Sequence, residues 1–186
     1  NIHQGNPAQV TEQVLSGEAE VGIATEAISL HSEIFCLPCY SWNRSLVLPK
    51  RHPLENKKNI TLKDISTYPL ITYDYAFTGS TIVSNTFKKA NLQPNIMLTA
   101  IDADVIKTYV NLNLGIGLVA EMAFNQKNDT GLVARDVSHL FPISTTFIGV
   151  RQDAFVRGFT MEFMSMFIRK LTKKELEILL QKRDAK

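Results

Sequence analysis

The sequence predicts an α/β fold, in which short apolar strands alternate with helices along 186 residues. Short apolar segments recur between stretches of helical periodicity, and residues typical of helix starts and ends separate them. No internal repeat or Gly/Ser-rich linker interrupts this alternation. The pattern therefore predicts parallel sheets flanked by helices, in one domain or in two small lobes with separate cores.

The N-terminal segment carries the first elements. Asn1–Gln4 is expected to form a strand, and Gly5-Asn6-Pro7 then places a capping asparagine and a first-turn proline before a helix. That helix covers Ala8–Ser16 and ends at Gly17, because glycine readily adopts the left-handed conformation at a helix end. Glu20–Ala24 follows as a short buried strand.

The rest of the chain continues the alternation. Strands are expected at Cys36–Tyr40, Ser45–Leu48, Tyr68–Tyr73, Asn95–Ala100, Gly115–Ala120, Val133–Val137 and Thr145–Val150. Helices are expected from Thr61, from Thr78-Gly79-Ser80-Thr81 to about Ala90, from Asp102 to about Asn113, over about Ala154–Lys170, and from Thr172. If the chain forms two lobes, it is expected to cross between them near Tyr40 and near Ser144, through strands and not through a flexible tether.

Composition and charge exclude several function classes. Twenty Lys and Arg against eighteen Asp and Glu give a net charge of +2, too little to indicate nucleic-acid binding by this chain. No apolar run approaches the roughly 20 residues that span a bilayer, so no membrane partner is expected. The N-terminus does not resemble a signal peptide, and the cytoplasm is the expected compartment.

The side chains give no support for catalysis or metal binding. Cys36 and Cys39 are too few for a disulfide framework, and no second Cys/His pair is present to complete a zinc site. Because they lie in an apolar strand and not at a helix start, both are expected to be small core side chains. No nucleophile, acid–base pair or phosphate loop indicates an enzyme, and neither a metal nor a cofactor is expected.

Small hydrogen-bond donors occur at three strand ends or helix starts: Thr25, Thr78-Gly79-Ser80-Thr81 and Asp102-Ala103-Asp104. A helix start has free N–H groups and a partial positive charge, so it can hold an anion without Arg or Lys. In open α/β sheets, ligands bind beyond the carboxyl ends of strands, where these donors are expected. Neutral donors suit a small, fully ionised anion such as sulfate. From the residues alone, helix capping explains Thr78 and Ser80 better than anion binding does.

Two aromatic features have more than one interpretation. Trp42 lies on the connection between two strands, where it can form the wall of a cleft or anchor a core. The last long helical segment carries an aromatic stripe, Phe155, Phe159, Phe163 and Phe167. Core packing explains most of such a stripe, and a subunit interface can use the excess apolar surface.

Seven segments resemble one protein family. They are HQGNPAQ at His3–Gln9, GIATEA at Gly22–Ala27, LPCYSWNRSLVLPKRHPL at Leu37–Leu54, YPLITY at Tyr68–Tyr73, FTGS at Phe77–Ser80, DADVIKTYVNLNLGIGLVA at Asp102–Ala120 and FIGVRQDAFVR at Phe147–Arg157. Over nearly its whole length the chain resembles the effector-binding domain of the LysR-type transcriptional regulators. Within this family it is similar to the CysB group, activators of sulfur assimilation and cysteine synthesis.

The resemblance implies a periplasmic-binding-protein-like fold of two Rossmann-like α/β lobes joined by crossover strands. Lobe I would comprise residues 1–40 and 145–186, without the first βα unit of the family pattern, and lobe II would comprise residues 41–144. The winged helix-turn-helix through which the family binds DNA is expected to be absent from this chain. A homodimer or homotetramer is expected.

The resemblance also implies a small anionic effector in the cleft: sulfate, N-acetylserine or O-acetylserine. The cleft positions of the CysB group match Thr25, Trp42, Thr78 and the backbone around Ala103, and Asn6 falls where relatives also line the cleft. Thr78 is thereby expected to bind the ligand and to cap its helix. A transport binding protein of the same fold is the first alternative, and an enzyme on the same scaffold is the second.

Overall fold

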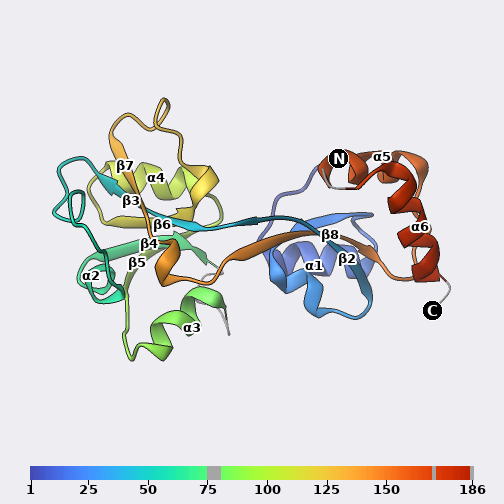
Figure 1. Cartoon of the computed structure of the whole chain (residues 1–186), viewed down its shortest axis with the longest axis horizontal. Helices are drawn as coiled ribbons and strands as arrows, with labels where there is room; N and C mark the ends of the chain where they lie inside the picture. The colour runs from blue at the N-terminus through green and yellow to red at the C-terminus, as the bar shows by residue number, and fades with distance from the viewer. Residues whose placement is uncertain (75–80, 169–170, 185–186) are drawn as a thin grey trace. The chain divides into compact units, whose positions relative to one another are not determined.

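The chain folds into two compact units in the computed structural model, which describes residues 1–74, 81–168 and 171–184. Unit 1 comprises Asn1–Ser41 and Ser144–Lys186, and unit 2 comprises Trp42–Ile143. The chain therefore passes between the units twice, between residues 41 and 42 and between residues 143 and 144. Each unit has its own sheet and its own helices (Figure 1), so the predicted α/β class is confirmed.

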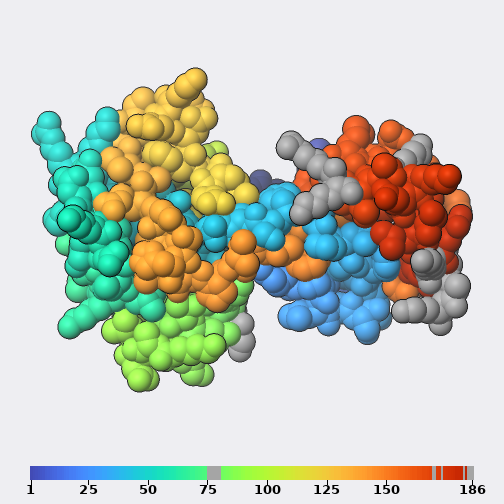
Figure 2. All heavy atoms as spheres, in the orientation of Figure 1, coloured from blue at the N-terminus to red at the C-terminus, as the bar shows by residue number. Residues whose placement is uncertain are grey.

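Unit 1 is a three-stranded sheet covered by helices on both faces (Figure 1). Across the sheet the strands are β1 (Gly22–Ala24), β8 (Ser144–Arg151) and β2 (Ile34–Trp42), and the helices are α1 (Pro7–Ser16), the 3₁₀ helix η1 (Glu26–Leu30), α5 (Gly158–Phe167) and α6 (Lys173–Asp184). Val14 and Ile28 bury one face of the sheet, and Met164 and Leu176 belong to the cluster on the other face. Figure 2 shows atoms of α5 and α6 together on the surface of this unit.

The sequence predicts α1 well because its signals are local. Asn6 Oδ1 accepts hydrogen bonds from the backbone N–H groups of Ala8 and Gln9, at 3.1 and 3.0 Å. The Gln9 side chain accepts in return from the Asn6 N–H at 2.9 Å, which completes a capping box. At the other end Gly17 has a φ of 78°, the left-handed conformation that ends a helix at low cost in glycine.

Two predictions for unit 1 are wrong. Residues 1–6 lie outside any helix or strand, because an extended segment becomes a strand only when a neighbouring strand accepts and donates its hydrogen bonds. Helix α5 begins at Gly158 and not near Ala154. Arg183 of α6 donates to the carbonyl oxygens of Arg151 and Ala154, at 3.3 and 2.9 Å, so a tertiary contact holds this segment in a turn.

Unit 2 is a five-stranded sheet, and its strand directions correct the prediction of parallel sheets. Its strands, in order across the sheet, are β5 (Asn95–Ala100), β4 (Pro69–Tyr73), β6 (Ile116–Ala120), β3 (Arg44–Pro49) and β7 (Leu132–Asp136). β4 pairs in parallel with β5 and β6, but β3 pairs antiparallel with β6 and β7. In unit 1, β1 also runs antiparallel to β8. Parallel neighbours need a crossover helix, and α3 and α4 supply one only to β4, β5 and β6.

Helices cover both faces of the sheet in unit 2. They are α2 (Leu62–Ser66), α3 (Ile82–Lys89) and α4 (Ala103–Asn111), with the 3₁₀ helices η3 (Glu121–Ala123) and η4 (Ser138–Leu140). Ile65 of α2 and Phe87 of α3 belong to one core cluster with Leu46. Ile106 of α4 packs with Val47 in the cluster on the opposite face. No helix of the described ranges is long and apolar enough to cross a bilayer.

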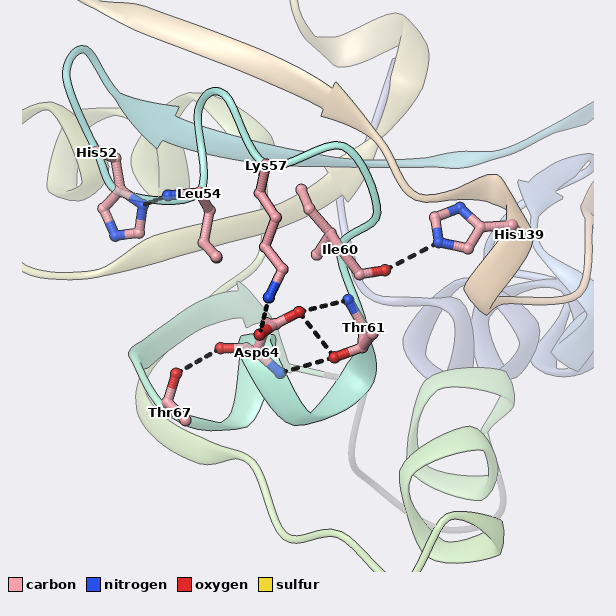
Figure 3. A network of polar contacts seen from close by, with 8 residues as sticks. All are labelled: His52, Leu54, Lys57, Ile60, Thr61, Asp64, Thr67 and His139. Carbon is pink, nitrogen blue, oxygen red and sulfur yellow. Dashed lines mark hydrogen bonds and ion pairs between the residues drawn. The ribbon is translucent and has the colours of Figure 1, made fainter.

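A polar network fixes the start of α2 (Figure 3). Asp64 Oδ2 accepts from the Thr61 N–H at 2.8 Å and from its hydroxyl at 2.7 Å, while Lys57 Nζ lies 2.6 Å from Asp64 Oδ1. His139 Nε2 lies 2.9 Å from the Ile60 carbonyl oxygen, and His52 Nδ1 accepts from the Leu54 N–H at 3.2 Å. These two histidines thus have structural partners.

The network predicts an acid-sensitive contribution to stability. Burial opposes ionisation of Asp64, but hydrogen bonds from Lys57 and Thr61 outweigh it and lower the pKa of this carboxyl. Because the folded pKa is lowered, the stabilisation is complete above the ordinary value of 3.8 and is lost as the pH falls through the lowered pKa. Urea unfolding is therefore expected to show Asp64→Asn less stable than wild type at pH 7, with the difference narrowing only below pH 3.8.

The matched control is Asp153→Asn, because the Asp153 side chain is 75% exposed in its ion pair with Arg151. It is expected to change stability little at any pH. A difference between wild type and Asp64→Asn that stays constant down to the lowest pH would contradict the assignment.

Candidate functional site

The predicted site residues fall into both units. Asn6 and Thr25 belong to unit 1, and Trp42 and Ala103 belong to unit 2. Thr78 lies outside the described residues. Asn6 is the N-cap of α1, so its side-chain oxygen already accepts two backbone hydrogen bonds.

Thr25 differs from the Asn, Asp and other Thr residues that begin helices in the described ranges. It directly follows β1 and is the N-cap of η1, with extended backbone angles and a half-buried side chain. Its hydroxyl makes no capping bond to η1. The side chains of the Asn, Asp and other Thr residues at N-cap positions bond to their own helices: Asn6, Thr61, Thr81 and Asp102. Thr25 is therefore a donor that the local fold does not use for capping.

Trp42 lies at the end of β2 and is 6% exposed. The Arg44 guanidinium carbon lies 5.0 Å from the centroid of the Trp42 ring and 5.8 Å from that of Phe141. Arg44 Nη1 also donates to the Pro142 carbonyl oxygen at 3.3 Å. A cation–π contact of this kind attracts the guanidinium to the ring face, so Arg44 contributes to holding the indole in place.

Ala103 is the first residue of α4, and its N-cap is Asp102, as the sequence predicts. Asp102 Oδ1 accepts from the Val105 N–H at 2.9 Å. The first N–H groups of a helix have no acceptor within it, so the backbone at Ala103 offers donors and a partial positive charge to an anion. This geometry is compatible with the predicted role of the Ala103 backbone.

Lys107 forms a polar cluster that sequence reasoning missed. Its ammonium group lies 3.1 Å from Asp129 and 3.0 Å from Asp104 and donates to the Ala123 carbonyl oxygen at 2.9 Å. Burial lowers the pKa of Lys107, but the bonds to Asp104 and Asp129 outweigh it, so the net shift is upward. The cluster lies beside a surface pocket of about 240 Å³, which Asn111 and Thr108 also line. No local sequence signal pairs residue 107 with residue 129.

The two cysteines are core side chains, as predicted. Cys36 Sγ lies 3.6 Å from the Ile28 carbonyl oxygen and packs on the α1 face of the sheet. Cys39 is buried in the cluster on the opposite face, with α5 and α6. Burial and then the nearby Cys39 raise the pKa of Cys36 to about 11, and burial also raises the pKa of Cys39.

This placement predicts that both thiols are unreactive in the folded protein. A thiol must ionise to react, and the raised pKa keeps Cys36 protonated at pH 8. We expect modification by an aromatic disulfide reagent to be slow in buffer and rapid in denaturant. Fast modification of either thiol in buffer would contradict the assignment.

The aromatic stripe corrects a second interpretation, and its first member, Phe155, lies before the start of α5. Core packing was expected to account for most of it, yet Phe155, Phe159 and Phe163 are 90%, 65% and 42% exposed. Instead, α5 packs against the core of unit 1 through Met164, which is fully buried, and through the partly buried Phe167. The subunit-interface interpretation of this face remains a prediction.

The comparisons with known proteins agree on one family. A model of the LysR substrate binding domain matches residues 1–171. The HTH-type transcriptional regulator SsuR of Burkholderia cenocepacia is 48% identical over 180 residues, 97% of this chain and 58% of that protein. The HTH-type transcriptional regulator CysB of the same species is 44% identical, over 95% of this chain and 56% of that protein. The chain thus spans about half the length of the curated relatives it matches.

Solved structures share the fold. The crystal structure of the cofactor-binding domain of the Cbl transcriptional regulator is 34% identical, with a TM-score of 0.85 over 96% of this chain and 78% of that chain. The effector-binding domain of QuiR in complex with shikimate is 14% identical with a TM-score of 0.77, over 91% of this chain and 80% of that chain, and shows the fold alone. These structures confirm the predicted periplasmic-binding-protein-like α/β fold.

Proposed function

This chain belongs to the family of LysR substrate binding domains, and we propose that it is the effector-sensing domain of a transcription activator of cysteine biosynthesis and sulfate assimilation. The similarity to SsuR, CysB and Cbl supports this proposal, and the names of these relatives do not favour the transport alternative. Transcriptional regulators are not enzymes. Binding to DNA would use a domain outside this chain, in the cytoplasm.

The proposed effector is a small molecule with an anionic group: sulfate, N-acetylserine or O-acetylserine, each of which carries a sulfate or carboxylate charge. The observation that carries this proposal is the hydroxyl of Thr25, which follows a strand and does not cap the helix that begins there. The backbone N–H groups at Ala103 supply a second set of neutral donors. Thr78, Trp42 and Asn6 complete the proposed set of contact residues.

A homodimer or homotetramer is part of the proposal. Relatives of this class act as oligomers on DNA, and the exposed phenylalanines of α5 offer an apolar surface to a neighbouring subunit. Effector binding would change the assembly only to the extent that the effector binds two of its states with different affinity.

The single tryptophan makes a simple test of effector choice possible. Trp42 is the only tryptophan in the sequence, so fluorescence reports on one proposed contact residue. We expect a saturable change with sulfate or an acetylserine and none with chloride at equal ionic strength. No change with any of the three proposed effectors would contradict the proposed set of contacts.

A further inference from the structure

Glu26 connects the loop that carries Thr25 to the places where the chain leaves unit 1. Its carboxylate oxygen Oε1 accepts a hydrogen bond from the Thr145 backbone N–H at 2.7 Å. The Thr145 hydroxyl in turn lies 3.2 Å from the Ser41 hydroxyl. We name these residues, Glu26, Thr145 and Ser41, the crossing node. All three belong to unit 1, although Glu26 and Thr145 are 119 positions apart in the sequence.

The strand register explains why Glu26 meets Thr145. β1 pairs antiparallel with β8, and its last pair is Ala24 with Phe147. Two positions further along, the same register would place residue 26 opposite residue 145. The backbone has by then turned into η1, so it cannot continue the ladder. The Glu26 side chain replaces the missing backbone acceptor and satisfies the Thr145 N–H.

The hydrogen bond between Glu26 and Thr145 lies next to both points at which the chain passes between the units. The chain links the two units only between residues 41 and 42 and between residues 143 and 144. Ser41 is the last residue of unit 1 before the first crossing, and Thr145 is the second residue after the return. A conformational change that starts in the loop at Thr25 and travels along the chain to unit 2 has to pass one of these crossings.

Resting on the proposed function of Thr25, we propose that Glu26 is a positioning residue that transmits effector occupancy to both crossings. An anion bound at Thr25 lies one residue along the chain from the Glu26 carboxylate. The two negative charges repel each other, and the Thr145 N–H partly neutralises the carboxylate by a charge-assisted hydrogen bond. Anion binding therefore favours the state in which the bond to Thr145 is made, and Thr145 passes the restraint to Ser41.

Hydrogen–deuterium exchange of the intact protein tests this role, with sulfate as the ligand and calorimetry to measure its affinity. In wild type, sulfate is expected to lower exchange in residues 144–147 and around Ser41. Glu26→Ala is expected to bind sulfate as tightly as wild type or more tightly, because one negative charge near the anion is removed. The protection of residues 144–147 is expected to be lost in the same variant, and Glu26→Gln, which keeps an acceptor oxygen, is expected to restore part of it.

Two control variants make the result specific. Glu12→Ala removes the same side chain from an exposed position on α1 and is expected to behave as wild type. Ser41→Ala leaves the Glu26 bond intact, so protection of residues 144–147 is expected to remain while the effect around Ser41 is lost.

Two results would overturn the proposal. Sulfate protection of residues 144–147 in Glu26→Ala equal to that in wild type would show that Glu26 transmits nothing. A Glu26→Ala variant that loses both its affinity for sulfate and the protection of residues 144–147 would show that Glu26 only supports the fold around Thr25. A wild-type protein that binds none of sulfate, N-acetylserine and O-acetylserine in the calorimeter would instead overturn the proposed function itself, and the transmission role with it.

Discussion

Replacing Thr25 with valine is expected to weaken sulfate binding about tenfold or more, with the fold intact. Valine has nearly the same shape as threonine but lacks the hydroxyl donor, and a hydrogen bond to a charged group contributes about 1.5–3 kcal/mol. The hydroxyl makes no capping bond to η1, so its removal leaves the helix start unchanged. Isothermal titration calorimetry of wild type and variant measures the change in affinity.

The matched control is Thr67→Val. The Thr67 hydroxyl donates to the Asp64 carbonyl oxygen at 2.7 Å at the end of α2, and no role in effector binding is proposed for it. This variant is expected to bind sulfate as wild type does. A Thr25→Val protein with wild-type sulfate affinity would remove Thr25 from the site.

The largest effect on stability is expected for Phe87→Ala. Phe87 of α3 is 1% exposed and packs in the main core of unit 2. The centroid of its ring lies 6.1 Å from the ring centroid of Phe141. Truncating a buried phenylalanine removes apolar contacts and leaves a cavity, which costs about 3–5 kcal/mol. Trp42 also belongs to unit 2, so urea unfolding followed by its fluorescence measures this loss.

Phe155→Ala is the control for this comparison. Phe155 is 90% exposed, so the same truncation is expected to change the free energy of unfolding by no more than about 0.5 kcal/mol. The assignment of the core of unit 2 would be wrong if Phe87→Ala were no more destabilising than Phe155→Ala.

Local signals made much of the fold predictable. The capping residues Asn6, Thr61 and Asp102 lie within three residues of the groups they bind, so the starts of α1, α2 and α4 follow from the sequence. Strand direction was not predictable in this way. It depends on which strands become neighbours, and β3 and β7 pair across more than 80 positions of the chain. The start of α5 was misplaced because the bonds that Arg183 makes come from a different helix.

In the candidate site, too, local sequence signals identify some residues, and others are brought together only by the folded chain. Thr25 could be identified because it directly follows an apolar strand, and Ala103 because Asp102 marks a helix start. The contact of Glu26 with Thr145 and that of Lys107 with Asp129 join residues that only the folded chain brings together. The exposure of Phe159 was not predictable from its spacing, because a periodic stripe does not say whether a partner covers it.

Calorimetric titration of the wild-type protein with sulfate and then N-acetylserine shows whether this chain senses a small anion through Thr25. We expect saturable binding of at least one of them, with competition between the two if they share the site. A folded protein, verified by circular dichroism, that gives no binding heat and no change in Trp42 fluorescence with either ligand would contradict this expectation.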